Sequence, residues 1–207
     1  MLKFEQLENT FLNLFDALAN RFADLNFKPN YITIFAFIFA ILAGISFYLS
    51  NYFLLPASIF AALNAILDLM DGMVAKKIKQ VTKRGEFLDH MLDRFSDTII
   101  LLGISFSDNC NTLLGLLAAI SVLLVSYSNA QGQAVGVKII YKDLLGKEKR
   151  YLLYLIIPII QFLLFLSSHN KIFRNFTLLD FLMLWFIIAG IYTTFSRSAK
   201  IWKSIKE

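Results

Sequence analysis

Residues 67–95 read LDLMDGMVAKKIKQVTKRGEFLDHMLDRF, and this stretch decides how the chain is interpreted. It places four carboxylates in or beside apolar segments long enough to cross a bilayer: Asp68, Asp71, Asp89 and Asp93. An ionised group in such a segment is costly unless another group compensates its charge. On helices, spacings of three and four residues put each acidic pair on one face of its own helix. We therefore expect two acidic helix faces that can meet.

Five basic residues separate the two acidic pairs: Lys76, Lys77, Lys79, Lys83 and Arg84. Such a run continues a membrane span poorly and forms a water-exposed turn well, so it predicts an antiparallel hairpin. The hairpin would gather the four carboxylates near one membrane surface. Like charges at that distance stay ionised only if a cation joins them, and oxygen ligands suit a hard divalent ion such as Mg²⁺ or Mn²⁺. The pattern predicts a metal site.

The same stretch resembles the signature of the CDP-alcohol phosphatidyltransferase family, which is DxxDGxxAR, eight residues, then GxxxDxxxD. The residues that carry the resemblance are Asp68, Asp71, Gly72, Ala75, Lys76, Gly85, Asp89 and Asp93. Only Lys76 departs from the signature, since the family usually has Arg there. Lysine keeps the positive charge but lacks the bidentate fork that grips a phosphate in a fixed plane.

The resemblance implies transfer of a phosphatidyl- or archaetidyl-type group from a CDP-linked lipid to a small alcohol acceptor, with CMP as the leaving group. It implies two Mg²⁺ or Mn²⁺ ions, which would neutralise the diphosphate and align the reacting oxygens. Asp68, Asp71 and Asp89 would be metal ligands. Asp93 would be the general base for the acceptor hydroxyl and would also touch a second ion.

The resemblance also implies a set of donor-binding residues: Asn30, Tyr31, Ile32, Thr33, Gly72, Ala75, Lys76 and Thr82. A glycine at position 72 would let the nucleotide approach the helix backbone, although a glycine can also serve helix packing. Lys76 would pair with a phosphate, or else only anchor the helix at the membrane surface. Thr82 would donate its hydroxyl to the diphosphate. Asn30 has an alternative role as an ordinary helix N-cap.

The composition predicts an all-α integral membrane protein, because 57% of the 207 residues are hydrophobic and the mean hydropathy is +0.63. We expect an amphipathic juxtamembrane helix over residues 1–27, lying on the membrane or packed against the protein, and no secretory signal peptide. A six-helix domain over residues 28–207 should follow. The expected spans are about 31–49, 53–75, 87–106, 112–135, 151–166 and 178–195.

The distribution of basic residues predicts the orientation of these spans. Of the 20 Lys and Arg residues, 17 fall on one side, Lys171 and Arg174 fall on the other, and Arg94 lies within the third expected span. We therefore expect a multi-pass protein of the cell membrane with both termini and the carboxylates on the cytoplasmic side. The resemblance implies a homodimer in membrane lipid, and we expect no nucleic-acid partner.

Family members that use inositol phosphate share two further patterns with this chain, in Asp93-Arg94-x-Ser96-Asp97 and in Ser126-Tyr127. The candidate acceptor-binding residues are Asn129, Gln131, Lys147 and Arg150. An anionic polyol phosphate is the leading acceptor, with serine, glycerol phosphate or a neutral polyol as alternatives. Apolar side chains do not distinguish ester-linked from ether-linked lipid tails.

Two residues within the motif have plain structural interpretations. Arg94 can pair with Asp97 at i+3, with a catalytic role as the alternative, and His90 is expected to pack or cap. Two other functions also fit buried carboxylates. A cation- or proton-coupled transporter would spread acids through the bilayer depth, whereas here they crowd toward one side. A non-catalytic scaffold is disfavoured because all four Asp positions are filled.

Overall fold

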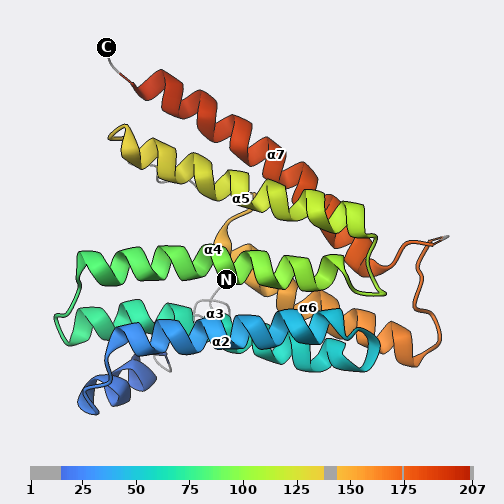
Figure 1. Ribbon diagram of the computed structural model, residues 1–207, viewed down its shortest axis with the longest axis horizontal. Helices are drawn as coiled ribbons and strands as arrows, with labels where there is room; N and C mark the ends of the chain where they lie inside the picture. Colours follow the sequence, from blue (N-terminus) through green and yellow to red (C-terminus); the bar gives the residue numbers. More distant parts are fainter. Residues whose placement is uncertain (1–14, 138–143, 174, 206–207) are drawn as a thin grey trace, which may run out of the picture. The chain divides into compact units, whose positions relative to one another are not determined.

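The structure, a computed structural model, describes residues 15–137, 144–173 and 175–205. Within these ranges it is helical, and its only β-type pairing is an isolated bridge between Phe173 and Phe176. A helix over residues 15–24 is followed by α2 (Pro29–Tyr48), η1 (Asn51–Phe53), α3 (Leu54–Lys77), α4 (Lys83–Ser105), α5 (Thr112–Ala134), α6 (Lys147–Leu166) and α7 (Leu178–Ser204) (Figure 1). The expected all-α class is confirmed.

Five helical segments in the described residues are long and apolar enough to cross a membrane: 29–48, 51–77, 112–134, 147–166 and 178–204. The third expected crossing corresponds to α4, which has 23 residues but does not meet the same criterion. Its N-terminal half carries Asp89, His90, Asp93 and Arg94, and these charges dilute the apolar character of the helix. The several apolar helices indicate a membrane protein, with five candidate spans in place of the expected six.

The charged ends of two helices extend beyond the apolar segments that predicted them. α6 begins at Lys147, one turn before the expected start near residue 151, because Lys147, Glu148 and Lys149 form its first turn. α7 begins at Leu178, as predicted, and ends at Ser204, beyond the expected end near residue 195. At its start, Thr177 Oγ1 accepts a hydrogen bond from the Asp180 N–H at 3.2 Å. In return, Asp180 Oδ2 accepts from the Thr177 N–H at 2.8 Å, which completes a capping box.

The described residues form two compact units, one of residues 15–39 and 63–93, the other of residues 40–62 and 94–205 with the gaps given above. The first unit has a small core of Ala19, Ile32, Met70 and Val74. Helix 15–24 packs into this core through Ala19. The lysine at position 77 donates to Asp16 Oδ1 at 2.7 Å and to Asn20 Oδ1 at 2.6 Å. Helix 15–24 is therefore packed against the protein, and residues 1–14 of the expected juxtamembrane helix lie outside the described ranges.

Small residues allow the helices of the second unit to approach closely. A Cβ on Gly103 would lie 2.1 Å from the carbonyl oxygen of Gly44, and a Cβ on Gly190 would lie 2.8 Å from Cβ of Ser121. Figure 1 shows the result for the second pair, with α5 and α7 running side by side. Membrane helices commonly associate through such small-residue contacts, because lipid supplies little hydrophobic drive for helix association.

The connection between α4 and α5 holds the only cysteine of the sequence, Cys110. Burial, together with the nearby Asp180 carboxylate, raises the pKa of this thiol to about 12. The thiol therefore stays protonated at physiological pH, and the reactive thiolate forms only in strong base.

We expect the Gly103→Ala substitution to destabilise the second unit by roughly 1–3 kcal/mol, because its methyl group would overlap the Gly44 carbonyl. The measurement is the thermal unfolding midpoint of the purified protein in detergent. Gly146→Ala is the control, since no atom lies within 4 Å of a Cβ added there. Equal midpoints for the two variants would contradict the close crossing.

We expect Cys110 to react with iodoacetamide at pH 8 on the order of a thousandfold more slowly than an ordinary thiol, because so little thiolate is present. The alkylation rate should rise with pH up to about 12. The matched control replaces Cys110 by Ser and places a cysteine at the exposed Asp24. If the alkylation rate of the wild type stopped rising at a pH near the pKa of the control thiol, the pKa of Cys110 would not be raised by burial.

Candidate functional site

The first unit contains a cavity of about 270 Å³, lined by the start of α2, the end of α3, the connection after it and the start of α4. Two predicted metal ligands, Asp71 of α3 and Asp89 of α4, both line it. Six predicted donor-binding residues also line it: Asn30, Thr33, Gly72, Ala75, Lys76 and Thr82. The hairpin expected from the basic run therefore brings residues of both motif halves to one place.

Thr82 shapes the entrance of α4 into this cavity. Its Oγ1 accepts a hydrogen bond from the Gly85 N–H at 3.1 Å, and its carbonyl oxygen accepts from the Glu86 N–H at 3.0 Å. The hydroxyl acts as an acceptor toward Gly85, which leaves its proton available for donation to a ligand. The threonine thus caps the helix and can still serve the predicted contact with a diphosphate.

The two motif glycines play different parts. A Cβ added to Gly72 would have no heavy atom within 4 Å, so helix packing does not require glycine there. The bare backbone of Gly72 instead borders the cavity. A Cβ on Gly85 would lie 3.2 Å from Asn30 Oδ1 and 3.2 Å from Thr82 Oγ1, so its small size allows the first turn of α4 to approach α2.

Two predicted donor-binding residues do not line the cavity. Ile32 is 1% exposed and belongs to the core of the first unit, with Met70 and Val74. Tyr31 is 52% exposed, and its ring centroid lies 6.3 Å from that of Phe27. The reason is helical geometry, because four consecutive residues of α2 cannot share one face. Of the run over residues 30–33, the structure places Asn30 and Thr33 at the cavity.

The carboxylates on α4 are arranged as metal ligands would be. One ligand atom each from Asp89, His90 and Asp93 lies within 4.8 Å of the other two. Ligand atoms at about 2.1 Å from one six-coordinate ion stand roughly 3–4 Å apart, so separations of this size are compatible with shared coordination. Asp71 and Asp93 are buried, whereas Asp68 and Asp89 are partly exposed. These residues fit a hard divalent cation.

His90 lies in this group although no site role was predicted for it from the sequence. It was expected to pack or cap, and its side chain is 57% exposed and lies beside two aspartates of the motif. Its spacing of three residues from Asp93 is the signal that points to this arrangement.

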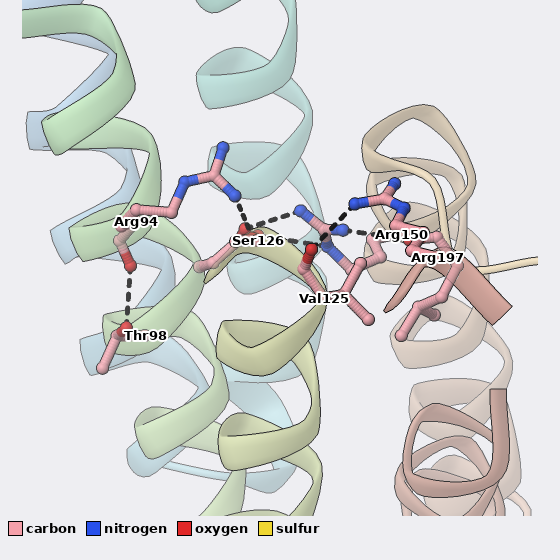
Figure 2. A network of polar contacts seen from close by, with 8 residues as sticks. Arg94, Thr98, Val125, Ser126, Arg150 and Arg197 are labelled. Carbon is pink, nitrogen blue, oxygen red and sulfur yellow. Dashed lines mark hydrogen bonds and ion pairs between the residues drawn. The ribbon is translucent and has the colours of Figure 1, made fainter. Parts of the chain in front are cut away.

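The second unit holds a separate cluster of polar side chains, shown in Figure 2. Arg94 of α4 donates to Ser126 Oγ of α5, and Arg197 of α7 donates to the Val125 carbonyl at 2.7 Å. Arg150 of α6 pairs with Asp97 Oδ2 at 2.6 Å and donates to the Leu145 carbonyl at 3.2 Å. Asp97 was expected to pair with Arg94, but it pairs with Arg150, which is 53 residues away in the sequence.

The four predicted acceptor-binding residues do not form one compact group. Arg150 is 2% exposed and held by Asp97. The Lys147 ammonium lies 5.7 Å from the ring centroid of Tyr151. Asn129 and Gln131 are two residues apart on α5, so they point to different sides of the helix. Arg197 was not singled out from the sequence, although it is one of only four basic residues after the last apolar segment.

Comparison with known proteins identifies the family. Its model, described as CDP-alcohol phosphatidyltransferase, matches residues 26–195. The chain is 36% identical over 121 residues to archaetidylinositol phosphate synthase of Pyrococcus horikoshii, covering 58% of this chain and 63% of that protein. It is 35% identical over 137 residues to the protein of the same name from Methanothermobacter thermautotrophicus, covering 64% of this chain and 69% of that one.

Two crystal structures of Mycobacterium tuberculosis phosphatidylinositol phosphate synthase share the fold. The complex with manganese and citrate has a TM-score of 0.74 at 17% identity, covering 91% of this chain and 88% of that one. The structure with CDP-DAG bound has a TM-score of 0.71 at 16% identity, covering 92% and 94%. The family model spans most of the sequence and includes the whole Asp68–Asp93 signature, so the chain belongs to the CDP-alcohol phosphatidyltransferase family.

Proposed function

We propose that this chain is a membrane transferase that moves a phosphatidyl- or archaetidyl-type group from a CDP-linked lipid to an alcohol and releases CMP, in phospholipid biosynthesis. The observation that carries the proposal is the single cavity that Asp71 of α3 and Asp89 of α4 line together with Lys76 and Thr82. The same cavity thus offers carboxylates that can bind a cation and side chains that can donate hydrogen bonds to a phosphate. A diphosphate bound through a metal ion needs both kinds of group.

The donor diphosphate would bind between the end of α3 and the start of α4. Lys76 would supply a positive charge, and Thr82 a hydroxyl proton. The N-terminus of α4 would add backbone N–H groups and the positive end of its dipole. Gly72 and Ala75 would leave room for the nucleotide, with Asn30 and Thr33 on the cytidine side of the cavity.

Asp68, Asp71, Asp89 and Asp93 would hold Mg²⁺ or Mn²⁺, most simply as two ions. The bound cations would neutralise charge on the phosphates and polarise the phosphorus centre. Asp93 would accept the proton of the acceptor hydroxyl as a general base. Its burial, at 7% exposure, protects that carboxylate from bulk water.

We propose an inositol-phosphate-like polyol phosphate as the acceptor, with serine or glycerol phosphate as the alternatives. The names of the archaeal relatives support this choice. Arg94 and Arg197 of the polar cluster in the second unit support it too, since guanidinium groups are the usual partners of phosphate, whereas the neighbouring Arg150 is already paired with Asp97. The other predicted acceptor contacts, Lys147, Asn129 and Gln131, remain candidates for binding the acceptor.

In the membrane, α4 would be the third of six crossings in a domain over residues 28–207, with residues 1–27 as a juxtamembrane helix. The termini and the cavity would face the cytoplasm, as the distribution of basic residues in the sequence indicates. Five residues of that count lie outside the described residues: Lys3, Lys138, Lys142, Arg174 and Lys206. We also propose a homodimer embedded in membrane lipid. No observation in the described residues favours a transporter, because carboxylates from both helices gather at one cavity.

We expect Asp93→Asn to lower CMP release from a CDP-linked lipid by roughly 10²–10⁴-fold, because the amide cannot accept the acceptor proton. The assay contains Mn²⁺ or Mg²⁺ and inositol phosphate, and a parallel panel replaces inositol phosphate by serine, glycerol phosphate or inositol. Asp24→Asn, on the exposed side of helix 15–24, is the control and should keep wild-type turnover. Turnover by Asp93→Asn within about twofold of wild type would refute its role as the base.

We expect Arg197→Gln to raise KM for a phosphorylated acceptor by roughly 10–100-fold. The substitution would remove the proposed hydrogen bond from the Arg197 guanidinium to the acceptor phosphate, and a hydrogen bond between charged groups is worth that much. KM for the CDP-linked lipid should change little. Lys200→Gln, one turn further along α7 and exposed, is the matched control. Equal increases in both KM values for Arg197→Gln would argue for general damage to the fold and against an acceptor contact.

A further inference from the structure

His90 occupies a position in α4 that none of the roles assigned above uses. One of its ring nitrogens belongs to the group of ligand atoms from Asp89, His90 and Asp93 that lie within 4.8 Å of one another. The ring itself is exposed, so it is not a packing residue of the core. At about 100° per residue, the three side chains fall within an arc of roughly 100° on one side of the helix.

We propose that His90 supplies a nitrogen ligand to the divalent cation held by Asp89 and Asp93, and that this nitrogen makes the site prefer Mn²⁺ to Mg²⁺. The inference rests on the metal site of the proposed function and adds a ligand that the family signature does not contain. It concerns only the first unit, where all three residues lie.

The nitrogen changes the selectivity of the site for a simple chemical reason. Mg²⁺ is a hard cation that prefers oxygen ligands in a nearly ideal octahedron. First-row transition ions accept imidazole more readily, so one imidazole in an otherwise carboxylate shell favours Mn²⁺ relative to Mg²⁺.

Glu86 is placed to orient the imidazole. Its Oε1 lies 3.9 Å from His90 Nε2, one turn earlier on the same helix, and Glu86 also lines the cavity beside Asp89. An exposed pair of this kind contributes little stability by itself. At 3.9 Å the two atoms do not form a hydrogen bond. With a cation bound, a shorter contact from Nε2–H to Glu86 would leave Nδ1 as the ligand, which is the usual way in which an outer carboxylate supports a metal-bound imidazole.

The sequence offers a clean spectroscopic test, because it contains two histidines. Mn²⁺ is added to the full-length protein in detergent, and pulsed EPR measures the hyperfine coupling of the bound ion to ¹⁴N. We expect an imidazole coupling in the wild type that changes to a ¹⁵N coupling when histidine is ¹⁵N-labelled. The coupling should disappear in His90→Gln and persist in His169→Gln, the matched control in the connection between α6 and α7.

Binding constants give a second, independent readout. We expect His90→Gln to weaken Mn²⁺ binding by about 10-fold or more, and Mg²⁺ binding by about twofold, while His169→Gln changes neither. Bound Mn²⁺ without imidazole coupling in the wild type, or equal losses for both ions, would overturn the nitrogen ligand and leave the proposed function standing. A wild-type protein that binds no Mn²⁺ would overturn both. Circular dichroism confirms that each variant is folded.

Discussion

The cost of keeping ionised carboxylates next to apolar helices is the constraint on which this structure depends. Asp71 and Asp93 are buried in the first unit, in a chain whose helices are otherwise long and apolar. Such charges persist only where partners compensate them. Asp71 of α3 and Asp89 of α4 line one cavity, at which a cation and the phosphates it binds would add to that compensation.

The rest of the first unit holds that arrangement in place. Helix 15–24 packs Ala19 against Met70 and Val74, which are the neighbours of Asp71 and Ala75 along α3. Asp16 and Asn20 bind Lys77 at the end of the same helix, next to Lys76 of the cavity. A segment far away in sequence thus braces the ligand-bearing turn of α3. The second unit uses a different device, with glycines and serines that let whole helices approach closely.

The positions of several helices and of one turn could be predicted from the sequence, because they depend on local patterns of residues. The apolar segments predicted α2, α3 and α5 to within a few residues, and the basic run predicted the turn between α3 and α4. The failures have equally local causes. Counting apolar residues missed the charged first turn of α6 at Lys147. The donor-binding run over residues 30–33 stays a prediction, of which only Asn30 and Thr33 line the cavity, because consecutive helix residues point in different directions.

The sequence by itself determined the helical class, the membrane character and the acidic signature, because each follows from the order and spacing of residues along the chain. Only the tertiary structure decided which distant side chains meet. It paired Asp97 with Arg150 across 53 residues and brought Arg197 to the carbonyl of Val125. Such pairings depend on how helices pack in three dimensions, and spacing within one helix carries no information about a partner on another.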